Sequence, residues 1–199
     1  MKNYPKYVKS TLNAVILDMS KHPENFCSRP GKDFTRKRKL PFEKILSLLV
    51  KMGGHSLRDE MLDCLDFEEM PASVSALVQQ RGKIPPEALK YLFHKFTATC
   101  EKPKLYKGYR LLAVDGSDLQ FTANPNDPLS YFPGANGQKH YSFLHLNALY
   151  DLNSNLYLDA IVQKKRAANE NAALINMVDK SQIAQPVILI ADRGYEAYN

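Results

Sequence analysis

Arg110-Leu111-Leu112-Ala113-Val114-Asp115 and Val187-Ile188-Leu189-Ile190-Ala191-Asp192 are two short apolar runs, and each ends in an aspartate. Apolar runs of this length, bounded by turn residues, predict buried strands. Residues 143–149 and 156–162 are two further strand candidates joined by a hairpin-type turn, and a helix opens at 169–171. The last strand is expected to lie parallel to the first, because a helical crossover precedes it. This order predicts an α/β fold with a mixed sheet.

The two aspartates that end these runs are candidate metal ligands. If the first and last strands are neighbours, Asp115 and Asp192 emerge at the same edge of the sheet, where sites in α/β folds form. Two hard oxygen ligands suit Mg²⁺ or Mn²⁺. Metal ions held in this way activate a water or a 3′-hydroxyl in phosphodiester chemistry. Aspartate is also common in turns after strands, so the spacing alone leaves a purely structural role open.

Residues 1–104 carry apolar residues at helical spacing and predict a separate helical region, with residues 105–199 as the second domain. The expected helices cover approximately residues 7–19, 42–52, 57–65, 74–80 and 86–96. Pro41 suits a helix start, and Ser56 and Ser73 are expected caps. Two short helices around a turn are compatible with a helix-turn-helix, and equally with a plain helical bundle.

Charge separates the two parts of the chain. Residues 1–110 contain 21 Lys and Arg against 12 Asp and Glu, whereas residues 111–199 contain 6 against 9. A basic front favours a polyanion as partner, although an uneven surface charge on an ordinary soluble protein is the alternative. The candidate DNA-contacting residues are a basic run and the polar side of one predicted helix: Arg36, Lys37, Arg38, Lys39, Ser73, Ser75, Gln79, Gln80 and Arg81.

Composition excludes several classes of protein. No run of 18 uncharged apolar residues is present, and the N-terminus does not have the pattern of a secretory signal. Cys27, Cys64 and Cys100 are dispersed and odd in number, which indicates reduced thiols and neither a disulfide frame nor a zinc site. The expected location is therefore the cytoplasm.

Several motifs, in this order along the chain, resemble DDE transposases of the insertion-sequence-four group. Val114-Asp115-Gly116-Ser117 and Ile190-Ala191-Asp192-Arg193-Gly194-Tyr195-Glu196 are similar to the first and second catalytic motifs of that group. Residues 34–42, 52–57 and 73–81 are similar to its N-terminal region.

This resemblance implies a ribonuclease-H-like core preceded by an all-helical DNA-binding region. It implies that Asp115 and Asp192 are catalytic and bind Mg²⁺, with Mn²⁺ as a substitute. It also implies cleavage and strand transfer at transposon ends in double-stranded DNA, with a homodimer as the full-length protein. The setting would be the bacterial cytoplasm, in association with the nucleoid.

The third carboxylate of that group is a glutamate in a later Tyr-Arg-Glu-Lys motif. The sequence ends at Asn199, seven residues past Asp192, and Glu196 is too near Asp192 to replace that glutamate. We therefore expect a truncated catalytic domain that is inactive by itself, and the alternative function is a DNA-binding protein or inhibitor without catalysis. A phosphatase-like hydrolase with Asp115 as nucleophile is a further alternative, but it needs an aspartate where Ser117 stands.

Three other polar residues near the motifs have weaker expectations. Asp118 is expected to be a turn residue, with support of Asp115 as the alternative. His140 and His145 are five positions apart, so they would face opposite sides of a strand and chelate poorly together.

Overall fold

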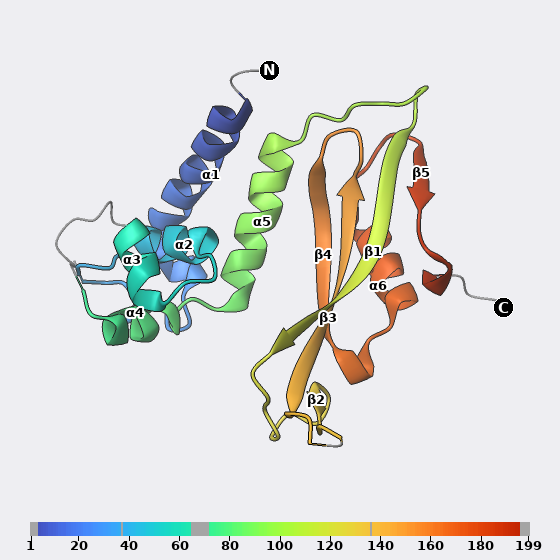
Figure 1. Cartoon of the computed structure of the whole chain (residues 1–199). Coiled ribbons are helices and arrows are strands. Elements are labelled where there is room, and N and C mark those ends of the chain that lie inside the picture. The colour runs from blue at the N-terminus through green and yellow to red at the C-terminus, as the bar shows by residue number, and fades with distance from the viewer. Residues whose placement is uncertain (1–3, 37, 65–71, 136, 196–199) are drawn as a thin grey trace. The chain divides into compact units, whose positions relative to one another are not determined.

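The computed structural model describes residues 4–36, 38–64, 72–135 and 137–195, and it divides the chain into two compact units (Figure 1). The first unit covers residues 1–100 and the second covers residues 101–199. Residues 102 and 104 are tied to the second unit, because their carbonyls accept hydrogen bonds from Ser154 and Asn153. In the described part of the chain, no helix is long and apolar enough to cross a membrane.

All of the regular secondary structure described in the first unit is helical. Its elements are α1 (Tyr4–Ser20), η1 (Pro23–Phe26), α2 (Phe42–Lys51), α3 (Leu57–Cys64), α4 (Val74–Arg81) and α5 (Pro86–Cys100). Local signals set the boundaries: the Ser73 side chain accepts the Ala76 N–H at the start of α4, as a cap residue does. The prediction of five helices is confirmed, whereas η1 had no counterpart in the sequence reading.

One apolar core holds these helices together. Its most deeply buried members come from α1, α2, α3, α4 and α5: Ile16, Met19, Ile45, Leu46, Leu48, Met61, Leu77, Ala88 and Leu92. The buried Glu60 closes the turn before α3, because its Oε1 accepts the N–H groups of Gly53 at 2.9 Å and His55 at 3.0 Å. These two backbone donors hold the pKa of Glu60 below its ordinary value.

The second unit is a mixed sheet with one long helix. Its elements are β1 (Arg110–Phe121), β2 (Tyr131–Phe132), β3 (Tyr141–Asp151), β4 (Leu156–Lys164), η2 (Lys165–Ala167), α6 (Glu170–Lys180), β5 (Val187–Ile190) and η3 (Arg193–Tyr195). The sheet order is β2-β3-β1-β5, and β4 also pairs with β3. All pairs are antiparallel except β1 with β5, which is parallel.

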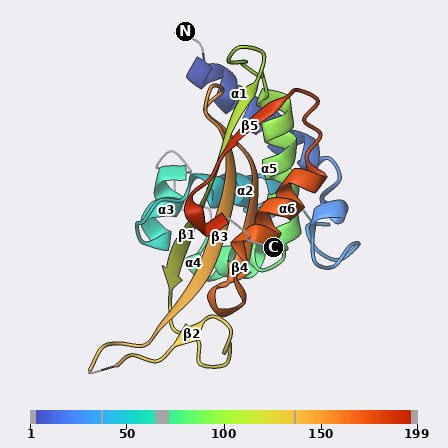
Figure 2. The same cartoon turned by 90° about the vertical axis from the view of Figure 1, so that its right-hand side faces the viewer.

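Helix α6 packs on one face of this sheet, as Figure 2 shows. Met177 on α6 is buried against Leu112, Val114 and Leu149, which face it from β1 and β3. The expected order of helices first and a mixed α/β sheet second is therefore confirmed.

Two details of the sheet differ from the prediction. Strand β1 does not stop at Asp115, where the apolar run ends, but continues to Phe121, paired with β3 along its whole second half. The expectation that the apolar run from residue 187 forms a buried strand is also wrong in its burial. The four side chains of β5 are 39–50% exposed, so neither face of β5 is fully covered by the described residues.

Candidate catalytic site

The parallel pairing of β1 and β5 brings Asp115 and Asp192 to the same level of the sheet. Ala113 is the register partner of Ile190, the last residue of β5. Asp115 follows Ala113 by two residues, and Asp192 follows Ile190 by two residues. Neighbouring strands of a sheet lie about 4.8 Å apart. Two sequence-predicted site residues that are 77 positions apart in the chain are thus placed on adjacent segments.

Backbone hydrogen bonds hold one oxygen of each aspartate. The Gly116 N–H donates to Asp115 Oδ1 at 2.8 Å, and the Gly194 N–H donates to Asp192 Oδ1 at 2.6 Å. Both aspartates are exposed, and within the described residues the second oxygen of each carries no hydrogen bond. Each carboxylate therefore has an oxygen that can reach a ligand from solvent.

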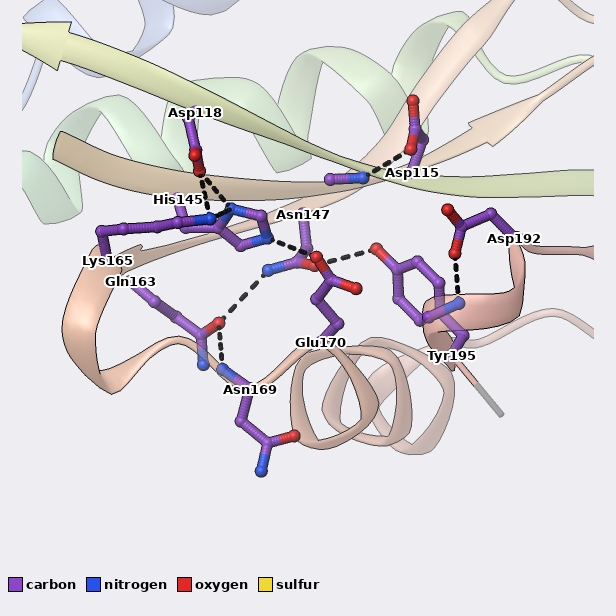
Figure 3. A network of polar contacts seen from close by, with 12 residues as sticks. Asp115, Asp118, His145, Asn147, Gln163, Lys165, Asn169, Glu170, Asp192 and Tyr195 are labelled. Carbon is purple, nitrogen blue, oxygen red and sulfur yellow. Dashed lines mark hydrogen bonds and ion pairs between the residues drawn. The ribbon is translucent and has the colours of Figure 1, made fainter. Parts of the chain in front are cut away.

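A line of charged groups runs along the α6 side of the sheet toward Asp192 (Figure 3). His145 Nδ1 lies 2.6 Å from Asp118 Oδ1, and Lys165 Nζ lies 2.8 Å from the same oxygen. On the other side of the imidazole, Nε2 lies 2.9 Å from Oε1 of Glu170, the first residue of α6. That approach has the distance of an ion pair but not the alignment of a hydrogen bond.

This line of charges fixes a histidine whose side chain is only 4% exposed. Asp118 and Glu170 lie on opposite sides of the ring and hold its orientation. Lys165 and His145 hold the pKa of Asp118 below its ordinary value. Asp118 is therefore an anchor within β1, and the expectation of a turn residue is wrong.

Tyr195 connects this line of charges to the aspartate pair. Its hydroxyl donates to Asn147 Oδ1 at 2.9 Å, and the Asn147 amide donates in turn to Gln163 Oε1 at 3.2 Å. Burial raises the pKa of Tyr195 to about 12, with further contributions from the charges of Glu170, Asp115 and Asp192. Three carboxylates thus surround a phenol that stays neutral and remains a hydrogen-bond donor at ordinary pH.

Two glycines provide the space that this arrangement occupies. A Cβ on Gly116 would lie 2.8 Å from His145 Nε2 and 3.0 Å from Glu170 Oε1. A Cβ on Gly194 would lie 3.0 Å from both Asp192 Oδ1 and Glu170 Oε2. Glu170 therefore fits between the two aspartate segments because both carry a glycine at the point of closest approach.

The sequence motifs do not indicate Glu170 or the contacts of His145 as parts of this region, and they include Tyr195 only as a member of the second motif. One signal was available: His145, Asn147 and Asp151 alternate with other residues along β3, and all three are buried. Buried polar groups at period two indicate a polar network on the covered face of a strand.

A divalent cation is the cofactor that the paired aspartates would take. Mg²⁺ keeps several waters and binds through one or two carboxylates, so two exposed aspartates have the right donor chemistry. Over the described ranges, no group of three or more His, Cys, Asp and Glu side chains is arranged to hold a metal ion. Asp115 and Asp192 are thus the residues that would hold it, with water and substrate oxygens as the other ligands.

The candidate DNA-contacting residues of the first unit are placed in two groups. Arg36 and Arg38 line a cavity that Gln80 also borders, whereas Lys37 lies outside the described residues. Arg36 and Arg38 are exposed, as are the other described members of the set except Gln80: Lys39, Ser73, Ser75, Gln79 and Arg81. Gln80 is only 7% exposed, because it follows the buried Leu77 by three positions and shares its face of α4.

Paired carboxylates at neighbouring strand ends occur in enzymes that cut or join phosphodiesters with divalent metal ions. Residues 106–199 match the model of a family described as the transposase DDE domain. This match spans most of the second unit and supports a DDE transposase, whose ribonuclease-H-like core is consistent with the fold seen here. Searches of curated proteins and of solved structures found no match.

Proposed function

We propose that this protein binds transposon ends in double-stranded DNA and catalyses metal-dependent strand cleavage and strand transfer. The observation that carries the proposal is the β1–β5 register, which sets Asp115 and Asp192 at one level within a segment that matches the transposase DDE domain. The insertion-sequence-four group, action as a homodimer on paired ends, and a bacterial cytoplasmic setting are parts of the same proposal.

The two aspartates would act through their exposed oxygens. A divalent cation bound there would supply an activated water or 3′-hydroxyl and stabilise the leaving oxygen. The chain itself contributes the positions of the carboxylates: the N–H groups of Gly116 and Gly194 orient them, and Tyr195 remains a neutral donor beside them. Mg²⁺ is the expected ion, with Mn²⁺ as a substitute.

A plasmid-cleavage assay tests this proposal. Supercoiled plasmid is incubated with Mg²⁺ or Mn²⁺ and the chain joined to a C-terminal part that carries the third carboxylate of the group, and nicked and linear products are measured by gel electrophoresis. Asp115→Ala and Asp192→Ala should each abolish cleavage and leave duplex binding in a mobility-shift assay unchanged. Asp179→Ala, which removes the same charge from the exposed surface of α6, is the matched control and should cleave as the unaltered chain does. Cleavage that survives in either site variant would refute the assigned roles.

DNA binding without cleavage is the second candidate function. The basic composition of residues 1–110 and the cationic cavity of the first unit favour it. The prediction from the sequence that residues 1–199 do not cut DNA by themselves agrees with this second candidate function. A duplex shift that weakens steeply with salt, together with no nicking in either metal, would support it over the first.

A further inference from the structure

A cavity of about 310 Å³ lies in the first unit between the loop before α2 and the end of α4. Lys32, Arg36 and Arg38 line it from the loop, and Gln80 and Lys83 line it from α4 and the turn that follows. Its lining thus contains four cationic side chains and no carboxylate. Such a concentration of positive charge in a concave site favours an anionic ligand.

Most of this positive charge is not neutralised by the protein. Lys32, Arg36 and Arg38 make no ion pair with any described residue. The nearby carboxylate of Asp33 is 2% exposed and is taken by Arg29, whose Nη2 lies 3.1 Å from Oδ1. The Lys83 Nζ approaches the same Asp33 oxygen only to 3.9 Å. The cavity therefore keeps three cations for a ligand.

Residues 28–34, which lead into the cation-bearing part of the loop, are held by defined contacts. Phe34 has a φ of 57°, which is uncommon for a residue other than glycine, and its ring packs edge-on against Phe42 at 5.4 Å. Asp33 accepts the Arg29 N–H at 3.1 Å, and the Ser28 N–H donates to the Lys83 carbonyl at 2.8 Å. A left-handed conformation held by packing and a buried acid is typical of pre-organised binding loops.

We propose that this cavity binds a phosphate group of the DNA backbone, with Arg36 and Arg38 as the principal ligands. Guanidinium groups bind phosphate oxygens in pairs of parallel hydrogen bonds, and Lys32 and Lys83 add positive charge at the rim. That the phosphate belongs to DNA rests on the proposed function, whereas the preference of the cavity for a phosphate group rests on its cationic lining alone. Contacts of this kind position the protein on DNA without reading sequence.

Fluorescence anisotropy with a labelled duplex tests the proposal on the full chain. Arg36→Gln with Arg38→Gln should weaken duplex binding about tenfold or more and, because one phosphate contact is lost, reduce the slope of log K against log salt by about 1. The matched control is Lys6→Gln with Lys9→Gln, which removes two exposed charges from α1 of the same unit. An equal loss in both pairs, or no loss in the arginine pair, would overturn the proposal.

A second measurement uses the unaltered chain and does not depend on the variants folding. Duplex DNA should slow the modification of Arg36 and Arg38 by phenylglyoxal, while Arg58, exposed on α3, should react at an unchanged rate. Protection by inorganic phosphate but not by duplex would identify a free phosphate as the ligand and overturn the DNA assignment. Both outcomes are independent of plasmid cleavage, so failure of the catalytic proposal is recognised separately.

Discussion

A buried ion pair at the start of β1 leads to the most quantitative prediction. Arg110 is 1% exposed, its Nε donates to Asp151 Oδ2 at 2.7 Å, and its Nη1 pairs with Glu101. Asp151 is fully buried, and its other oxygen accepts the N–H groups of Asn153 at 3.0 Å and Ser154 at 2.9 Å. The pair therefore joins the first residue of β1 to the β3–β4 turn.

Replacing Arg110 with methionine should destabilise the second unit strongly. The substitution leaves the Asp151 carboxylate buried without its charged partner, which costs about 3–5 kcal/mol of unfolding free energy. For a unit of this size, each kcal/mol lowers the melting temperature by about 4–8 °C, so a fall of about 12 °C or more is expected. Adding Asp151→Asn removes the isolated charge but keeps the acceptor for the turn. The double variant should therefore recover more than about 1 kcal/mol.

Thermal and urea unfolding, followed separately for each unit, measure these differences. Lys180→Met is the control, since it removes an exposed charge at the end of α6 and should change stability by less than about 0.5 kcal/mol. A loss below about 1 kcal/mol in Arg110→Met, or a double variant no more stable than the single one, would refute the reasoning.

Three further predictions concern the line of charges beside the aspartate pair. Gly116→Ala should lower the unfolding free energy by about 1–3 kcal/mol in urea, because its Cβ would lie 2.8 Å from His145 Nε2; an unchanged midpoint would contradict the contact. Tyr195→Phe should cost about 1 kcal/mol through the lost bond to Asn147. Because the pKa of Tyr195 is raised to about 12 in the folded state, the stabilisation from this residue is complete below the unfolded-state pKa near 10 and is lost as pH rises through the folded-state pKa. A Tyr195 ring that titrates near 10 by NMR would be inconsistent with this. Asp118→Asn should flatten the acid side of a plot of unfolding free energy against pH. The lowered pKa of Asp118 stabilises the fold above the unfolded-state pKa, and this stabilisation is lost as pH falls through the folded-state pKa.

The helices of the first unit and the four longer strands of the second could be predicted because their signals are local. Ser73 caps α4 in the way its sequence position indicates. Pro41 directly precedes α2. The apolar runs of β1 and β5, with a helix between them, were enough to predict parallel neighbours. From that pairing the placement of Asp115 and Asp192 at one level followed.

The parts that could not be predicted depend on contacts between distant residues. Residues 116–121 of β1 are mostly exposed and do not continue the apolar run, and pairing with β3 is what makes them strand. Likewise, Glu170 meets His145 only after α6 folds onto the sheet. The cavity that joins Arg36 to Lys83 requires a loop and a turn that are far apart in sequence.

The short ladder between β1 and β5 has a consequence for how the two aspartates move. Only four residue pairs join these strands, from Arg110 with Val187 to Ala113 with Ile190. Fraying of these few rungs would release Asp192 while Asp115 stays anchored by β3, so the two carboxylates can separate without global unfolding. Amide hydrogens of residues 187–190 should accordingly exchange sooner than those of β3, and a ligand bridging both carboxylates would slow that exchange.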